Sequence, residues 1–375
     1  MKTTIIQKVK IQNLFIAFML LSIFGNAQIS KQIDSLALIH ASKGFNGNVL
    51  YSKNNSIVFT GNYGFSDFTS KKPLNDSTVF ELASLSKQFT ALAIVQLVEK
   101  DLINYNTKVN KIIDNFPYRN ITIEHLLRHQ SGLPDYQKLF YDKKNWNRKK
   151  MATNQDVLNV LAKLKPSLVF EPGSKYDYDN TGYAVLALII ETLSKQPFEA
   201  YVTKNIFKPA GMETARVFNL KNNTRSLNNT ANGYTYNKKK EKYQKVEDDK
   251  NHKHVKWLNG VIGDRGIYAS ILDLEKWKKA LRNNTLITQL SKERMFSVDS
   301  ISPKYGYGFA IYNTESKGKW VYHNGSWSGY KTSAIYLPNS NEYLLILSNN
   351  RYGETYKKFE EDFYKLIILV SDKTI

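Results

Sequence analysis

The stretch that decides the fold runs from residue 84 to residue 97 and reads Ser84-Leu85-Ser86-Lys87-Gln88-Phe89-Thr90-Ala91-Leu92-Ala93-Ile94-Val95-Gln96-Leu97. Its apolar residues recur at the spacing of one helical face, and the pattern continues to Lys100. We therefore expect an amphipathic helix that begins near Ser84. At i and i+3 of a helix, the side chains of Ser84 and Lys87 share a face, so an amine lies within reach of a hydroxyl.

A serine with an amine beside it has the composition of a nucleophile with its base. A serine at a helix N-terminus also lies near backbone N–H groups that stabilise developing negative charge, which suits acyl transfer. Ser-x-x-Lys is nevertheless common by chance. In the alternative interpretation Ser84 only caps the helix and Lys87 lies on the surface, so the tetrapeptide needs support from elsewhere in the chain.

The overall composition is that of a globular protein. The 375 residues are 42% hydrophobic, 13% aromatic and 23% charged, which excludes disorder or a fibrous repeat as the main account. A single core stops growing near roughly 250–300 residues, so we expect two lobes. The sequence contains no cysteine, which excludes a disulfide scaffold, a thiolate nucleophile and thiolate metal sites. Any nucleophile must be oxygen or nitrogen.

Residues 1–27 have the pattern of a bacterial Sec-type signal peptide. Three lysines and no acidic residue precede or flank an apolar run, Leu14–Phe24, which ends in the small residues Gly25-Asn26-Ala27. The run is well short of the ~20 residues that span a bilayer as a helix. We expect cleavage after Ala27 and a mature chain, 28–375, that is periplasmic or secreted and has no transmembrane segment.

The charge is strongly basic, with a formal net charge of +20 for the full chain. Basic chains often bind nucleic acid, but a secreted protein rarely meets it, and we find no motif of interleaved basic and base-stacking aromatic residues. We expect no nucleic-acid partner. Solubility and weak attraction to anionic envelope polymers account for the charge.

The order of patterns along the chain predicts an α+β fold. A helical segment over 29–41 precedes two strand-like runs at 48–52 and 57–63, and helical patterns then dominate the middle of the chain. Further strands and a closing helix follow after about residue 304. We expect one antiparallel sheet built from both chain ends and flanked by helices, with an inserted, mostly helical lobe. The sheet lobe covers about 28–83 and 260–375, and the helical lobe about 84–259. The predicted helices are 84–100, 121–130, 155–164, 181–194, 197–207, 272–282 and 354–370, and the predicted late strands are 307–312, 319–323, 332–337 and 342–347.

Two further motifs could contribute to a site. In Tyr178-Asp179-Asn180 a phenol and an amide at i and i+2 of a loop can point the same way, one to shuttle a proton and the other to hold a lysine and a substrate amide. His323-Asn324-Gly325 ends a predicted strand, where the glycine permits close approach of a ligand and the N–H of Ser326 can serve as an oxyanion donor. Alone, the first is more often a turn before a helix, and the second an ordinary strand end.

Rival chemistries have weaker support. His125 and His129 have the i, i+4 spacing of zinc proteases, but Leu126 stands where the catalytic Glu should be, which favours structural roles. His252 and His254 lie in a lysine-rich segment without a third ligand nearby in sequence. No Gly-x-Ser-x-Gly elbow and no nucleotide-binding glycine loop occur. We expect neither a metal nor a cofactor.

Taken together, Ser-x-x-Lys, Tyr-x-Asn and His-x-Gly follow one another on a helix, a loop and a strand, and on these residues the chain resembles the serine β-lactamase and penicillin-binding-protein family. The similarity is to its class C β-lactamase and DD-peptidase branch, and it extends from about Gly47 to the C-terminal helix. Further similar stretches are Phe80–Ser84, His125–Leu133, Asp264–Ser270 and Tyr307–Phe309. The resemblance implies the β-lactamase/transpeptidase fold and a serine hydrolase.

The resemblance also implies roles for individual residues. Ser84 would be acylated, and either Lys87 or Tyr178 would take its proton. Tyr178 would pass a proton to the leaving group, and Asn180 would orient Lys87 and the substrate. The N–H groups of Ser84 and Ser326, beside Gly325, would hold the oxyanion, and His323 would contact the acidic end of the substrate.

The substrate is the least determined feature. Lactamases of the branch usually carry Lys-Thr-Gly where this chain has His323-Asn324-Gly325. A histidine of ordinary pKa ~6.5 is mostly neutral at pH 7, so we rank a short ester or a D-amino-acid peptide, peptidoglycan-derived peptides included, above a β-lactam. The alternative is a catalytically silent member that binds peptidoglycan or a partner. The sequence does not determine the oligomeric state.

Overall fold

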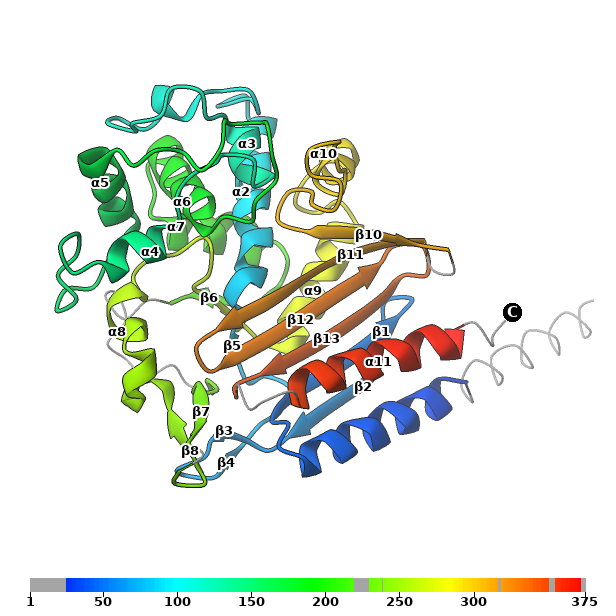
Figure 1. Ribbon diagram of the computed structural model, residues 1–375. Helices are drawn as coiled ribbons and strands as arrows, with labels where there is room; N and C mark the ends of the chain where they lie inside the picture. The colour runs from blue at the N-terminus through cyan, green and yellow to red at the C-terminus, as the bar shows by residue number, and fades with distance from the viewer. Residues whose placement is uncertain (1–24, 219–228, 238, 316–317, 351–354, 372–375) are drawn as a thin grey trace, which may run out of the picture.

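The computed structural model describes residues 25–218, 229–237, 239–315, 318–350 and 355–371. Its centre is a six-stranded antiparallel sheet in the order β10-β11-β12-β13-β1-β2. The first two strands in sequence lie at one edge and the last four complete the sheet (Figure 1), which confirms the predicted sheet built from both chain ends. The strands are β1 (Gly47–Lys53), β2 (Ser56–Tyr63), β10 (Ala310–Thr314), β11 (Gly318–Trp327), β12 (Tyr330–Leu337) and β13 (Glu342–Ser348).

The join between the chain ends is the pairing of β1 with β13, in which Gly47 faces Ser348 and Lys53 faces Glu342. The predicted hairpin of β1 and β2 is also present. Its two turn residues, Asn54 and Asn55, have φ of 51° and 67°. Asparagine tolerates this left-handed region better than most residues, and two such residues in succession match the twist of a hairpin.

Helices cover both faces of the sheet. The N-terminal helix (residues 25–42) and α11 (Thr355–Ser371) lie side by side on one face (Figure 1), where Ile33, Phe359 and Phe363 are almost completely buried. On the other face α9 (Ile271–Arg282) packs with the buried Trp277. These two layers hold the sheet as a rigid support.

The helical lobe surrounds α2 (Lys87–Glu99), which is buried from Lys87 to Leu97. The predicted helix therefore exists, but it is buried on all sides instead of amphipathic, because the other helices of the lobe and α9 enclose it. Helices were predicted in the right places at 121–130, 155–164, 181–194 and 197–207. The helices of this lobe are α3 (Ile123–Leu127), α4 (Tyr136–Tyr141), α5 (Asn154–Leu164), α6 (Asn180–Ser194), α7 (Phe198–Val202), a π-helical turn (Thr203–Phe207) and α8 (His254–Leu258).

Three boundaries differ from the predictions. The strand expected at 307–312 is β10, which begins only at Ala310, because Tyr307 and Phe309 are core residues of an irregular segment. The strand expected to end near His323 continues to Trp327 in β11. The helix expected to begin near Ser84 begins at Lys87 as α2. The prediction also missed the short helices α4 and α8 of the helical lobe. The other short elements that it missed are α10 (Gln289–Met295), β3 (Phe65–Asp67), β4 (Lys72–Pro73), β5 (Phe80–Glu81), β6 (Arg216–Val217), β7 (Tyr234–Asn237), β8 (Lys242–Lys245) and β9 (Ile267–Ala269).

The signal-peptide prediction falls mostly on residues 1–24, which lie outside the described residues. In the described part of the chain, none of the helices combines the length and the apolar character needed to cross a bilayer.

Candidate active site

Ser84 lies on a tight turn between the two lobes. The 3-10 turn η1 (Ala83–Ser86) connects β5 to α2, so the predicted α-helix begins three residues after Ser84. Ala83 has a φ of 50°, a conformation that costs an alanine about 1–2 kcal/mol. The buried carboxylate of Glu81 holds this turn by accepting the N–H of Ala83 at 3.2 Å and that of Gly266 at 2.9 Å. Such a strained residue next to a candidate nucleophile fixes the position of the serine.

Lys87 is fully buried, and its amine has three oxygen neighbours. Nζ lies 2.8 Å from Oδ1 of Asn180, 2.9 Å from the carbonyl oxygen of Asp264 and 3.4 Å from Oγ of Ser84. Burial lowers the pKa of Lys87 to about 8. A neutral amine has two N–H groups and one lone pair. The amide and carbonyl oxygens can only accept, so they take the two N–H groups, and the lone pair is left for the hydroxyl of Ser84.

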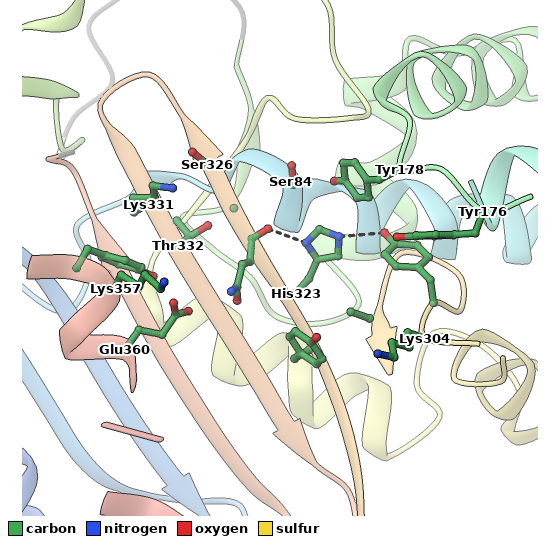
Figure 2. Close-up of a pocket in the computed structure, with 16 residues that line it drawn as sticks. Ser84, Tyr176, Tyr178, Lys304, His323, Ser326, Lys331, Thr332, Lys357 and Glu360 are labelled. Atoms are coloured by element: carbon green, nitrogen blue, oxygen red, sulfur yellow. Dashed lines mark hydrogen bonds between the residues drawn. The ribbon is translucent and has the colours of Figure 1, made fainter. Parts of the chain in front are cut away.

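Tyr178 and Asn180 lie beside this pair, as the Tyr-x-Asn motif suggested. Figure 2 shows the hydroxyl of Tyr178 turned toward Ser84. Burial raises the pKa of Tyr178 well above its ordinary value, so the phenol keeps its proton at neutral pH. Between them, Asp179 caps α6 by accepting the N–H groups of Thr181 and Gly182. The motif is therefore a loop that ends in a helix cap.

The strand opposite Ser84 has one open edge. β10 pairs with β11 only as far as Tyr322, so the segment His323–Trp327 is paired with β12 alone among the described strands. Gly325 serves close packing within the protein: a Cβ there would lie 2.4 Å from the carbonyl oxygen of Leu82 and 2.1 Å from Oγ1 of Thr332. The glycine thus lets β11 approach the turn that carries Ser84 and brings Ser326 to the same pocket.

His323 faces the same pocket but is 6% exposed, and both of its ring nitrogens have protein partners. Nε2 lies 2.9 Å from the hydroxyl of Tyr305, and Nδ1 lies 2.8 Å from the carbonyl oxygen of Asn324. Burial, with the nearby charge of Lys87, lowers the pKa of His323 to about 3. The imidazole is therefore neutral at pH 7.

These residues line one cavity of about 900 Å³ (Figure 2). Its walls come from η1, the loop before α6, the segment before β10, the strands β11 and β12, and the first turns of α11. The lining residues are Ser84, Tyr176, Tyr178, Lys304, Tyr305, Ala310, Tyr322, His323, Asn324, Gly325, Ser326, Lys331, Thr332, Tyr356, Lys357 and Glu360.

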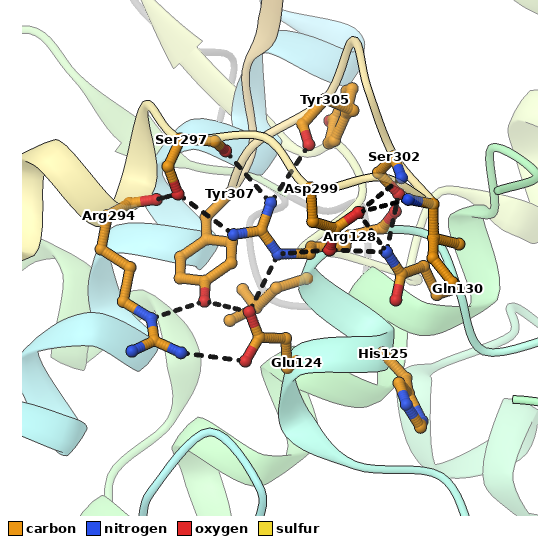
Figure 3. Close-up of polar contacts among 12 residues, drawn as sticks. Glu124, His125, Arg128, Gln130, Arg294, Ser297, Asp299, Ser302, Tyr305 and Tyr307 are labelled. Carbon is orange, nitrogen blue, oxygen red and sulfur yellow. Dashed lines mark hydrogen bonds and ion pairs between the residues drawn. The ribbon is translucent and has the colours of Figure 1, made fainter. Parts of the chain in front are cut away.

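A buried polar network fixes the wall that carries Tyr305 (Figure 3). Arg128, 4% exposed, donates to the carbonyl oxygens of Ser297 at 3.1 Å and Tyr305 at 3.4 Å. Its Nε also contacts Glu124 at 2.9 Å and Asp299 at 3.3 Å. The guanidinium thus ties α3 to the segment that leads into β10, and so holds the tyrosine that hydrogen-bonds His323.

Sequence reasoning did not place three further residues at this site. Asp264 supplies the carbonyl oxygen for Lys87, Tyr305 holds His323, and His129 lies under Tyr178 with ring centroids 4.3 Å apart. Asp264 and His129 belong to stretches on which the family resemblance rests. Tyr305 lies just before another such stretch, but its partner is distant in sequence and no local pattern indicates the contact.

The histidines considered for metal binding have other contacts. His125 closes a capping box with Thr122 at the start of α3, and Nδ1 of His129 accepts the N–H of Asp179 at 3.0 Å. His252 and His254 both hydrogen-bond Oγ of Ser328, at 2.9 and 2.8 Å. Within the described ranges, no group of three or more His, Cys, Asp or Glu side chains is placed to hold a metal ion.

An antiparallel sheet joined to a helical lobe, with a serine and a buried lysine at their junction, defines the class of active-site-serine hydrolases that includes penicillin-binding proteins. The comparisons with known proteins agree: the chain belongs to the Beta-lactamase family, which it matches over residues 38–367. It is thus a serine hydrolase of the β-lactamase-related family, as the sequence resemblance predicted.

Several relatives support this assignment. Penicillin-binding protein 4* of Bacillus subtilis is 37% identical over 318 residues, which are 84% of this chain and 70% of that protein. The D-aminopeptidase of Cereibacter sphaeroides is 26% identical over 303 residues, 80% of this chain and 55% of that protein. The crystal structure of the penicillin binding protein from Bacillus halodurans has a TM-score of 0.74 and 26% identity, and the match covers 90% of this chain and 98% of the other. D-amino acid amidase from Ochrobactrum anthropi, 18% identical with a TM-score of 0.74 and 93% and 100% coverage, shares the fold.

Proposed function

We propose that the protein cleaves an ester or amide through an acyl-enzyme on Ser84, with Lys87 as the general base. The observation that carries this proposal is the set of three oxygens around Nζ of Lys87, which leaves the lone pair of the neutral amine to Ser84. Because the phenol of Tyr178 is protonated at neutral pH, it serves better as a proton donor than as the base.

The proposed reaction has two halves. In acylation, Oγ of Ser84 attacks the substrate carbonyl carbon while its proton moves to Nζ of Lys87. The N–H groups of Ser84 and Ser326 hold the oxyanion, and the leaving alcohol or amine departs with a proton that Tyr178 delivers and regains from the Lys87 ammonium. In deacylation, water attacks the acyl-enzyme, gives a proton to Lys87 and releases the acid, and Ser84 recovers its proton.

For the substrate we propose a short ester or a D-amino-acid peptide ahead of a β-lactam. The neutral, buried His323 supplies no fixed positive charge beside Ser84. The relatives include a D-aminopeptidase, which agrees with this ranking. Parallel turnover of p-nitrophenyl butyrate, a D-Ala-D-Ala peptide and nitrocefin by one preparation tests it. Fast nitrocefin turnover with negligible ester and peptide cleavage would reverse the order.

A fluorophosphonate probe tests the nucleophile itself. We expect the probe to label the protein, and Ser84→Ala to abolish the label. Ser326→Ala is the matched control: it removes a hydroxyl from the same cavity but leaves the backbone N–H, so labelling should persist. Labelling that survives Ser84→Ala would refute the assignment. A wild-type protein that the probe does not label would favour the silent, peptidoglycan- or partner-binding alternative.

We also propose that the protein acts outside the cytoplasm, in the periplasm or as a secreted protein, after removal of residues 1–27. The charged, apolar and small-residue order of this segment supports the proposal. Expression of the full chain in a bacterium should give an extracytoplasmic protein whose intact mass begins at Gln28. A cytoplasmic protein that retains residues 1–27 would contradict it.

A further inference from the structure

A buried acid lies next to the amine of Lys87. Asp264 gives its backbone carbonyl oxygen to Nζ of Lys87 at 2.9 Å, and the residue is only 2% exposed. In the proposed reaction Lys87 becomes an ammonium when it takes the proton of Ser84. A buried ammonium needs a counter-charge nearby, because burial alone strongly disfavours the charged form. The carboxylate of Asp264 is a candidate for that counter-charge.

The backbone on both sides of Asp264 is fixed. Thr90, which follows Lys87 by three residues in α2, donates its hydroxyl to the carbonyl oxygen of Gly263 at 2.7 Å. The N–H of Gly266 donates to the carboxylate of Glu81 at 2.9 Å, just before the turn that carries Ser84. The segment is therefore tied to the same helix and turn as the reacting groups, so the carboxylate keeps its place relative to the amine.

The carboxylate of Asp264 has few hydrogen-bond donors. Oδ2 accepts the hydroxyl of Tyr136, from α4, at 3.0 Å, whereas Oδ1 is buried and has no hydrogen-bond partner among the described residues. A buried charge that is so little compensated acts strongly on other charges close to it, because the protein interior screens them weakly.

Asp179 is the second buried acid near the amine, but its charge is compensated. Its oxygens accept the N–H groups of Thr181 at 2.7 Å and Gly182 at 2.9 Å. Burial also raises the pKa of Asp179 to about 7, so this carboxyl group is only partly ionised at pH 7. Its negative charge is therefore less available to Lys87 than that of Asp264.

Of the other titratable groups that act on the amine in the described part of the chain, one is charged at pH 7. Burial lowers the pKa of the histidines and raises that of the tyrosines, so both kinds are neutral; they are His129, His323, Tyr178 and Tyr183. The charged group is Arg265, which opposes Asp264: the arginine lowers the pKa of Lys87 and the aspartate raises it. The guanidinium of Arg265 lies 3.9 Å from the ring centroid of Trp327 and donates to Asn259 at 3.3 Å.

We propose that the carboxylate of Asp264 is the counter-charge of the Lys87 ammonium, and that this positioning residue thereby sets the pH range in which Ser84 is acylated. The charge favours the ammonium both in the resting protein and after the amine has taken the proton of Ser84. Without it, the resting amine is neutral more often but is a weaker base. The inference rests on the proposed function for the role of Lys87 as the base.

Asp264→Asn tests the inference, because it removes the charge and keeps an oxygen that can accept from Tyr136. Wild-type acylation by p-nitrophenyl butyrate should rise about ten-fold between pH 7 and pH 9, since the pKa of Lys87 is about 8. Loss of the opposite charge should lower the midpoint of this rise by at least roughly one unit. The variant should therefore accelerate only about two-fold or less over the same range. An unchanged midpoint, however slow the variant, would overturn the inference.

Two further variants separate charge from packing. Asp135→Asn makes the same change at the start of α4, where the side chain caps the helix by accepting the N–H of Gln137 at 2.9 Å. Asparagine caps a helix equally well, so the ten-fold rise should remain. Asp264→Glu keeps the charge and should keep the wild-type midpoint even where altered packing slows acylation, and it decides the case if Asp264→Asn does not fold. A midpoint lowered by a full unit in either variant would overturn the inference.

A direct titration of Lys87 distinguishes failure of this inference from failure of the proposed function. Lysines labelled with ¹³C at Cε are titrated by NMR in the Ser84→Ala protein, and the Lys87 signal is identified by its loss on Lys87→Arg. Adding Asp264→Asn should lower the midpoint of that signal by at least roughly one unit. If Ser84 is acylated and this midpoint stays in place, the inference alone fails. If Ser84 is never acylated, the proposed function fails and the NMR titration decides the inference by itself.

Discussion

The titration of Lys87 offers a direct test of the chemistry at Ser84. If the neutral amine is the base, the acylation rate must follow the neutral fraction of a group whose pKa is about 8. About a tenth of the lysine is neutral at pH 7, about half at pH 8 and about nine tenths at pH 9. The acylation rate constant should therefore rise roughly five-fold between pH 7 and pH 8 and less than two-fold between pH 8 and pH 9.

The measurement is the pre-steady-state acylation rate with p-nitrophenyl butyrate from pH 6 to pH 9.5, corrected with the Ser84→Ala protein as blank. The Asn180→Asp variant should shift the pH dependence of the acylation rate. Oδ1 of Asn180 lies 2.8 Å from Nζ of Lys87, and a carboxylate at that position raises the pKa of the lysine by roughly one to three units. The midpoint should move upward accordingly. Lys87→Arg, which keeps the charge but cannot lose its proton, should reduce acylation by about 10²–10⁴-fold at every pH. A flat wild-type profile, or a midpoint that Asn180→Asp leaves in place, would refute the reasoning.

Three other substitutions test the support around the site. Gly325→Ala places a Cβ 2.4 Å from the carbonyl oxygen of Leu82, so it should separate β11 from the turn that carries Ser84. We expect fluorophosphonate labelling of Ser84 to become about 100-fold slower. A near-normal labelling rate would contradict this role of the glycine. Arg128→Met should lower the free energy of unfolding in urea by about 3–5 kcal/mol, because it leaves buried acceptors unpaired. The same change at the partly exposed Arg294 should lower it by less than about 1 kcal/mol. Equal effects of the two substitutions would show that burial of the network does not matter. Ala83→Gly removes the steric cost of the positive φ, so it should raise the free energy of unfolding by about 0.5–1 kcal/mol and leave ester turnover intact. A lower melting temperature of this variant would show that the turn is unstrained.

Local patterns predicted the elements that depend on neighbouring residues. The hairpin at 47–63, the helices of the middle segment and the late strands all follow from short-range periodicity. The same patterns misjudged α2, because burial on all sides depends on helices that arrive much later in the sequence. They also missed β5, β6 and β9, which are two or three residues long and exist only because they pair with one another.

In the candidate site, too, short motifs predicted some features, whereas others depend on residues that are distant in sequence. Ser84, Lys87, Tyr178 and Asn180 were found because each belongs to a short motif, and the structure brings them within contact of one another. What sequence could not provide is the protonation of Lys87, which follows from burial by distant segments. The sequence likewise could not show that both ring nitrogens of His323 are hydrogen-bonded. One of the partners is the hydroxyl of Tyr305, which does not belong to the strand that carries His323.

The pairing of β1 with β13 also constrains how the chain folds during synthesis. β1 is an interior strand of the sheet, yet one of its two partners is made near the end of translation. Until that partner emerges, β1 and β2 form an isolated hairpin, which is at best marginally stable in water. The sheet, and with it the face on which α11 closes, can therefore form only after nearly the whole chain has left the ribosome. For as long as synthesis lasts, the unfinished chain therefore lacks its central layer, because β1 is without one of its two partner strands.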